Sequence, residues 1–238
     1  MNTHQLILTA DLQSVGYEAG EPAVRGIRFE VSSGEMLGLI GPNGAGKSTT
    51  IKAIMGLLKH VDGSVRFHGP KQTYAYVPEH PILYEDLTLW EHVTFAASVM
   101  PSQSESGMAL ERAERLLSLF RLGDVRHHLP GSFSKGMQQK LMLVLAFMQQ
   151  PDLYIVDEPF IGLDPRATKQ LLALLAEERS RGAGIIMSTH VLDTAEKICS
   201  TFLLVNEGTA KASGDLRQIR TLAGMPDASL LDCFDALT

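Results

Sequence analysis

The chain has 238 residues, a formal net charge of −6 and a hydrophobic content of 45%. This length and composition can bury the core of one elaborated domain or of two small ones. The densest apolar helical run, at 141–148, is too short to span a bilayer, and residues 1–5 lack the charged-then-apolar pattern of a secretory signal. The mild negative charge, without a Lys/Arg cluster longer than a pair, disfavours a nucleic-acid-binding surface. We therefore expect a cytoplasmic protein that does not bind nucleic acid.

The first part of the chain is rich in short strands. Apolar runs bounded by turn residues predict strands at 6–8, 27–31, 36–40, 65–67 and 73–77. A helix is expected at 49–58, where apolar residues recur on one side. This helix follows the strand at 36–40 after a short loop.

That loop is rich in glycine, and its spacing, Gly-x4-Gly-Lys-Ser, is typical of a phosphate-binding loop (P-loop). Glycines let consecutive N–H groups curl around the anion, and the helix N-terminus faces it. Lys47 is placed to reach the β- and γ-phosphates, and the Ser48 hydroxyl to ligate Mg²⁺. We expect a nucleoside triphosphate to bind here, since a glycine-rich turn that binds nothing does not explain the flanking strand and helix. The predicted nucleotide-binding residues are Gly41, Pro42, Asn43, Gly44, Ala45, Gly46, Lys47, Ser48 and Thr49.

Helices dominate the next part of the chain. The sequence Thr-Leu-Trp-Glu at 88–91 is a capping box that begins a helical region reaching about residue 120. Ser134 and Gly136 open a further helix with an apolar stripe, and such a helix start can bind an anion. By itself this second pattern indicates only a capped helix.

The last part alternates strands and helices, with strands expected at 153–156, 185–189 and 202–205. Alternation of this kind implies a mostly parallel sheet. Together with the phosphate-binding loop, it predicts an α/β fold of the P-loop NTPase type.

Two carboxylates follow the strand at 153–156. Ligands of parallel sheets bind at the carboxyl edge of the strands, so Asp157 is placed to hold Mg²⁺ and Glu158 to orient and deprotonate an attacking water. The alternative is a solvated turn after a core strand, which the presence of the phosphate-binding loop disfavours.

The motifs in this order resemble the nucleotide-binding subunit of ATP-binding cassette (ABC) transporters over nearly the whole chain. The resemblance implies that Tyr17 stacks on adenine, that Glu158 is catalytic, and that Asp164 belongs to the loop after it, the D-loop. His190, which follows Ser-Thr, resembles the switch histidine that contacts the γ-phosphate; a histidine satisfied within the core is the alternative. A signature loop would act on the nucleotide of a partner subunit. Its residues are Ser134, Lys135, Gly136 and Met137.

The resemblance also implies a subdomain arrangement within one ABC ATPase domain at 1–238. A nucleotide-binding core with an N-terminal antiparallel β subdomain is expected at 1–84 and 141–215. A helical subdomain carrying the signature loop is expected as an insertion at 85–140, and a C-terminal tail at 216–238.

Two departures from the family pattern bear on turnover. Glu79 stands where the family usually has Gln; its carboxylate can ligate Mg²⁺ but adds negative charge beside a phosphate. In the signature loop, usually Leu-Ser-Gly-Gly-Gln, Lys135 adds positive charge and Met137 cannot replace the hydrogen bonds of Gln. We expect ATP binding to persist and the hydrolysis rate to depend on these positions.

The function implied is that of an ATP- and Mg²⁺-dependent ATPase subunit of a membrane transporter, bacterial and exporter-type, closest to the Ecs-type branch. Two such subunits, identical or different, would sandwich two ATP molecules head to tail. An integral membrane subunit would dock on the surface around 79–91, which places the chain at the inner face of the cell membrane.

Other function classes fit the sequence less well. A non-transport ABC ATPase acting on nucleic acid would carry a long coiled coil between the phosphate-binding loop and the signature, and one acting on the ribosome would usually carry two cassettes. A small-molecule kinase or GTPase gives no reason for the motifs at Ser134 and His190.

Overall fold

The computed structural model describes residues 5–238. The expectation about a secretory signal falls largely on residues 1–4, which lie outside the described residues. The strands are β1 (Leu6–Glu18), β2 (Glu21–Ser32), β3 (Met36–Ile40), β4 (His60–Phe67), β5 (Tyr74–Val77), β6 (Leu153–Asp157), β7 (Gly184–Thr189), β8 (Thr201–Asn206) and β9 (Thr209–Gly214). The main helices are α1 (Lys47–Ile54), α2 (Leu89–Ser98), α3 (Gln103–Phe120), α4 (Lys135–Phe147), α5 (Pro165–Arg181), α6 (Leu192–Ile198), α7 (Leu216–Ala223) and α8 (Leu230–Leu237).

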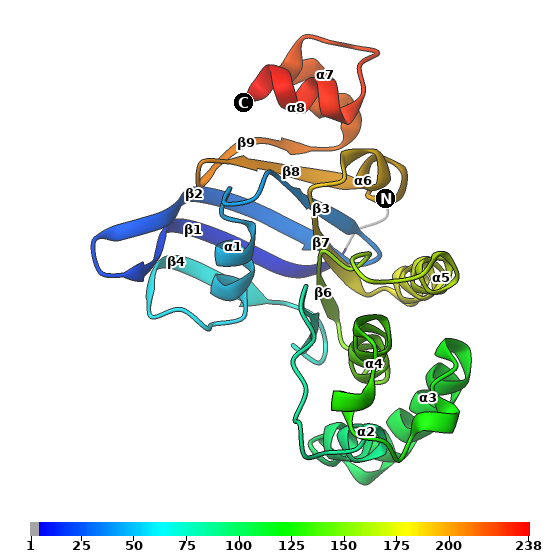
Figure 1. Ribbon diagram of the computed structural model, residues 1–238. Coiled ribbons are helices and arrows are strands. Elements are labelled where there is room, and N and C mark those ends of the chain that lie inside the picture. Colours follow the sequence, from blue (N-terminus) through cyan, green and yellow to red (C-terminus); the bar gives the residue numbers. More distant parts are fainter. Residues whose placement is uncertain (1–4) are drawn as a thin grey trace.

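Within residues 5–238, nine strands form one sheet in the order β4-β1-β2-β9-β8-β3-β7-β6-β5 (Figure 1). In its core, β3 pairs in parallel with β7 and β8, and β6 with β5 and β7. Every residue of β3, β6 and β7 is buried, as expected for parallel strands covered on both faces. The α/β fold class with a mostly parallel core is confirmed.

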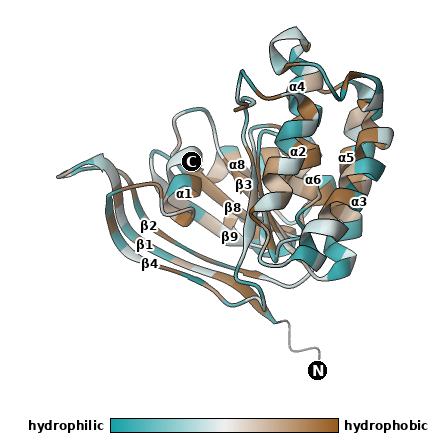
Figure 2. Ribbon diagram, turned by 90° about the horizontal axis from the view of Figure 1, so that it is seen from below, coloured by the Kyte–Doolittle hydropathy of each residue, from teal (hydrophilic) through white to brown (hydrophobic). Residues whose placement is uncertain are grey.

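The other part of the sheet is antiparallel, because β1 pairs with both β2 and β4. Figure 2 shows this curved part extending away from α2–α5. It joins the core where Arg25 of β2 pairs with Thr209 of β9. β1 runs well beyond the predicted 6–8, since its polar residues alternate with buried ones and both neighbouring strands pair with its backbone.

Helices α2, α3 and α4 lie together at the end of the sheet that carries β5 and β6 (Figure 1). The predicted capping box is present: the Thr88 hydroxyl accepts from the Glu91 N–H, and the Glu91 carboxylate accepts from the Thr88 N–H at 2.7 Å. The helical region breaks between α2 and α3, where Ser102 caps the second helix. The boundaries proposed for the helical subdomain stay a prediction, and α4 runs unbroken across residue 140.

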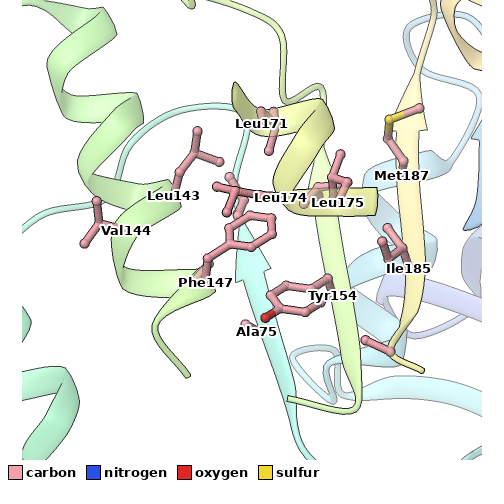
Figure 3. Packing of buried hydrophobic residues seen from close by; sticks show 14 of the residues in the cluster. Ala75, Leu143, Val144, Phe147, Tyr154, Leu171, Leu174, Leu175, Ile185 and Met187 are labelled. Carbon is pink, nitrogen blue, oxygen red and sulfur yellow. The ribbon is translucent and has the colours of Figure 1, made fainter. Parts of the chain in front are cut away.

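Hydrophobic clusters lie on both faces of the sheet. Alternation along β6 sends Tyr154 and Val156 into one cluster, with α2–α5, and Leu153 and Ile155 into the other, with α1 and the antiparallel strands. In the first cluster the ring of Phe147 on α4 stacks on Tyr154, with centroids 4.7 Å apart (Figure 3). The sheet therefore holds α1 and α4 on opposite sides of the strand that ends in Asp157.

Two further regions differ in detail from the expected elements. Residues 216–238, expected as a tail, contain α7 and α8, and α8 buries Leu230 and Cys233. Helix α1 stops at Ile54 rather than 58, because Gly56 takes a left-handed φ of 71°. Among the described residues, no helix combines the length and the apolar character needed to cross a membrane.

Candidate active site

The glycine-rich loop connects β3 to α1, and two of its glycines have steric reasons to be there. A Cβ on Gly41 would lie 2.2 Å from the Val205 carbonyl oxygen. Gly46 has a φ of 103°, and a Cβ there would lie 2.7 Å from Val24. Gly46 is also the N-cap of α1, and no side chain occupies the first-turn N–H groups of this helix. These groups are therefore available to bind an anion.

Lys47 is buried beside this loop. Its ammonium donates to the carbonyl oxygens of Gly41 at 2.7 Å and Pro42 at 3.2 Å. Burial lowers the pKa of Lys47, and the negative charges of Glu158, Asp157 and Glu79 oppose that shift. The ammonium thus stands in a site with more carboxylates than cations.

A pocket of about 290 Å³ opens at this point and brings together predicted residues from distant parts of the sequence. The phosphate-binding loop forms one wall, and three carboxylates from two other segments complete it. Its lining residues are Ala23, Asn43, Gly44, Gly46, Lys47, Ser48, Thr49, Glu79, Asp157 and Glu158.

Asp157, the last residue of β6, is held by two hydroxyl groups. Ser188 of β7, the register partner of Asp157, donates to Oδ1, and Tyr76 of β5 donates to Oδ2 at 3.4 Å. Burial, followed by the charge of Asp157, raises the pKa of Tyr76. The sequence gives no sign of either contact, because both depend on which residues of neighbouring strands face each other.

Glu158 follows directly and has a left-handed φ of 46°, which is unusual for a residue other than glycine. Its N–H donates to the Ser188 carbonyl at 3.1 Å. Its carboxylate contacts His190 Nδ1 through Oε1 at 2.8 Å and accepts from the Thr189 hydroxyl through Oε2 at 3.2 Å. Glu158 is buried, whereas half of the His190 side chain is exposed, so a histidine satisfied within the core is excluded.

The oxygen donors in the pocket fit a magnesium ion. Ser48, Glu79 and Asp157 all line it, and hydroxyl and carboxylate oxygens are the ligands that Mg²⁺ prefers. In the described part of the chain, no three His, Cys, Asp or Glu side chains are grouped so as to hold a metal by themselves. This suits Mg²⁺, which protein sites usually hold through one or two carboxylates together with substrate phosphates.

Tyr17 lies at the edge of this site. Its hydroxyl is 3.4 Å from the Thr49 hydroxyl and accepts from the Lys52 ammonium at 3.3 Å. The hydrogen bond to Thr49, aided by Lys52, lowers the pKa of Tyr17. The ring is 54% exposed, so it offers apolar surface next to the first turn of α1.

The signature-loop residues lie apart from this pocket: none of 134–137 is among its lining residues. Ser134 caps α4 by accepting from the Met137 N–H at 3.3 Å, while Lys135 is exposed. Asp164 caps α5 and accepts from the Lys140 ammonium at 2.6 Å. That ammonium is the main cause that lowers the pKa of Asp164.

Comparison with known proteins decides the family. The family model described as "ABC transporter" matches residues 24–161, more than half of the chain. The chain belongs to the ABC transporter family. Because the ATP-binding domains of this family hydrolyse ATP, this ABC subunit is an ATPase, and the nucleotide it binds is ATP.

Relatives of this ABC subunit agree along nearly its full length. It is 49% identical to the uncharacterized ABC transporter ATP-binding protein YthP of Bacillus subtilis, over 96% of this chain and 95% of that protein. It is 41% identical to the ABC-type transporter ATP-binding protein EcsA of the same organism, over 91% of each. A solved ATP-binding subunit of an ABC transporter superposes with a TM-score of 0.90 at 43% identity, over 97% of this chain and 99% of the other. The family resemblance expected from the motif order is confirmed.

Proposed function

We propose that this ABC ATPase works as a head-to-tail pair that powers a membrane transporter of exporter type. One observation carries the proposal: the chain places Lys47, Asp157 and Glu158 in one pocket, while the helix start at Ser134, the second predicted anion site, lies outside that pocket. A second subunit is then needed to bring such a helix start to the nucleotide. Two identical chains suffice for this arrangement.

Within one subunit, the proposed roles follow from the contacts. Lys47 and the first N–H groups of α1 hold the phosphates, and the exposed ring of Tyr17 stacks on adenine. Ser48 and Asp157, with Glu79, would hold Mg²⁺, which neutralises phosphate charge when bound.

The hydrolytic step is assigned to Glu158 and to the two residues that contact its carboxylate. Glu158 orients a water molecule and accepts its proton, and His190 and Thr189 hold the Glu158 carboxylate in place. Across the interface, Ser134 and Gly136 of the partner close over the γ-phosphate, with Lys135 adding positive charge. Asp164 is paired with Lys140, on the helix α4 that these residues begin.

Exposed apolar side chains of the 79–91 segment and helix α2 support a membrane partner. Ile82, Tyr84, Phe95 and Val99 are each more than half exposed, and Tyr84 and Phe95 pack edge to face with centroids 5.8 Å apart. This surface covers the 79–91 segment and the adjacent helix α2. Exposed apolar groups of this kind mark binding surfaces. We propose that an integral membrane subunit docks here, which would place the ATPase at the inner face of the membrane.

The direction of transport is inferred from relatives. The chain is 35% identical to a fluoroquinolones export ATP-binding protein of Mycobacterium tuberculosis, over 80% of this chain and 64% of that protein. The alternative of a ribosome- or nucleic-acid-acting ATPase gains no support from any of these relatives, which are transporter subunits by name.

The test is a complementation experiment with two inactive variants. Ser134→Arg puts a bulky cation where the partner's phosphate should approach a helix start, so the monomer should bind ATP but neither dimerise nor hydrolyse it. Lys47→Ala removes the phosphate contact. Each mixed dimer has one composite site with both changes and one with neither, so mixing should restore part of the activity. Full activity of Ser134→Arg alone would show that each chain works by itself and would refute the proposal.

A further inference from the structure

A buried ion pair joins helix α3 to helix α5. The Glu178 carboxylate, on α5, is fully buried, and it accepts from Arg112 on α3 and from Arg181 on α5. The contact from Arg181 Nε measures 2.7 Å, and only 10% of the Arg112 side chain is exposed. A carboxylate so far from water depends on these partners, because an unpaired buried charge is strongly destabilising.

The same two arginines bind the chain between α4 and β6. Arg112 Nε donates to the carbonyl of Phe147, the last residue of α4, at 2.7 Å. Arg181 donates to the carbonyl of Pro151 at 2.5 Å, in the turn that leads into β6. Tyr154 of β6 stacks on Phe147 (Figure 3), and burial, followed by the charge of Glu178, raises the pKa of Tyr154. Glu178 thus lies at the centre of a cluster that ties α3, α4, α5 and β6 together.

This cluster lies at the C-terminal end of α4 and the N-terminal end of β6. The opposite ends of these two elements hold predicted site residues. Helix α4 runs from the Ser134 cap to Phe147, and β6 runs back to Asp157. The far ends approach each other, because a Cβ on Gly136 would lie 2.8 Å from the Gly162 carbonyl in the loop after β6.

We propose that Arg112 and Glu178 are a positioning pair for ATP hydrolysis. The pair sets the tilt of α3 and α4 against α5 and β6, and so fixes where one subunit presents Ser134 and Gly136 to the nucleotide of the other. This inference rests on the proposed function, because it concerns a site shared by two subunits. Neither Arg112 nor Glu178 lines the nucleotide pocket.

The length of α4 makes the tilt matter. A helix of this size is about 20 Å long, so a tilt of about 3° at one end moves the other end by about 1 Å. A displacement of about 1 Å in a catalytic arrangement can lower turnover about 100-fold. Arginine suits the role because its planar guanidinium holds its donors in a rigid fork, with Nε on the Phe147 carbonyl and a terminal nitrogen on Glu178. The compact ammonium of lysine does not reproduce this fixed geometry.

The main test uses the full chain carrying Arg112→Met together with Glu178→Met. Removing both charges of a buried pair while keeping volume is often tolerated, whereas removing one leaves a buried charge unpaired. The matched control is Arg115→Met, one turn along α3 on an exposed side chain whose nearest carboxylate, that of Glu177, is 4.0 Å away. We expect the double variant (the Met pair) to fold and to have an unchanged KM for ATP, but to lose about 10- to 100-fold in kcat. The control should keep the KM and the kcat of the unmodified protein. A purely structural role would change the amount of folded protein but not the kcat of the folded molecules.

A second measurement separates this inference from the proposed function. In a Glu158→Gln background, the ATP-dependent dimer is measured by sedimentation with and without the Met pair, and we expect the pair to weaken it. If Glu158→Gln alone forms no ATP-dependent dimer, both proposals are overturned. If adding Arg112→Met and Glu178→Met leaves both the dimer affinity and the kcat unchanged, only the positioning role is overturned. Should the Met pair fail to fold, Arg112→Lys decides, since a lowered kcat at unchanged KM supports the role and an unchanged kcat refutes it.

Discussion

His190 Nδ1 lies 2.8 Å from Oε1 of Glu158, and this contact joins the two residues that we propose for hydrolysis. Because the Thr189 hydroxyl holds Oε2, both oxygens of the Glu158 carboxylate are fixed by residues at the end of β7. The end of a core strand therefore fixes the orientation of the Glu158 carboxylate.

Replacing the base should separate binding from turnover. Glu158→Gln keeps the size of the side chain but removes its basicity, so turnover should fall by about 10²- to 10⁴-fold with ATP affinity retained. Steady-state ATPase rates and nucleotide titration measure the two effects. His190→Ala is the companion variant, which should also lower kcat because it removes the contact that orients the Glu158 carboxylate and the side chain expected to reach the γ-phosphate. Near-normal turnover in Glu158→Gln would transfer the role of base to His190.

Removing the buried lysine should act on affinity. Lys47→Ala loses a charge-assisted contact worth about 1.5–3 kcal/mol, hence about 10- to 100-fold in ATP affinity. The protonated form of Lys47 is the one that binds phosphate, and burial lowers the pKa of Lys47 in the free protein. As the pH is raised, ATP affinity should therefore begin to fall at a lower pH than it would with a lysine of ordinary pKa. Calorimetric titration against pH checks both statements, and equal affinity in folded Lys47→Ala would refute the assignment.

The unusual carboxylate at position 79 gives a third comparison. If Glu79 faces Mg²⁺, Glu79→Gln should preserve or raise the ATPase rate, because it removes one negative charge from a wall that already holds Asp157 and Glu158. Glu79→Ala should weaken coupling to the membrane partner. The rates are measured over a Mg²⁺ titration with and without that partner. A loss of all activity in Glu79→Gln would show that the carboxylate has chemistry of its own.

The signature loop can be tested through its glycine. A Cβ on Gly136 would press on the Gly162 carbonyl oxygen at 2.8 Å, so Gly136→Ala must displace one of the two loops. Overpacking of this kind costs about 1–3 kcal/mol where neighbours cannot move. Gly131→Ala is the control, because its Cβ would meet nothing within 4 Å. Turnover and thermal unfolding should change in Gly136→Ala only; equal behaviour of both variants would mean that the loops move apart freely.

The elements that the sequence predicts best are those with local signals. β3 and β6 are continuous apolar runs, and the glycine spacing before Lys47 is a local pattern, so both are found without knowledge of the fold. β9 is missed because its residues, Thr-Ala-Lys-Ala-Ser-Gly, carry little β-propensity, although it forms a hairpin with the preceding strand β8.

The site shows the same difference between residues with a local sequence signal and residues placed by the fold. The predicted residues Lys47, Asp157 and Glu158 line one pocket, whereas the hydroxyl groups of Tyr76 and Ser188 that hold Asp157 are not predicted. Their positions depend on strand register, which no single segment encodes.

The position of Lys47 has a consequence for how the pocket receives its ligand. With its ammonium held by the Gly41 and Pro42 carbonyls, the loop is already curled around a positive charge before any phosphate arrives. If Lys47 binds the phosphates as proposed, nucleotide entry exchanges these carbonyl oxygens for phosphate oxygens as the partners of the ammonium. We therefore expect the loop to act as a preorganised receptor, in which rigidity adds to charge in selecting phosphate.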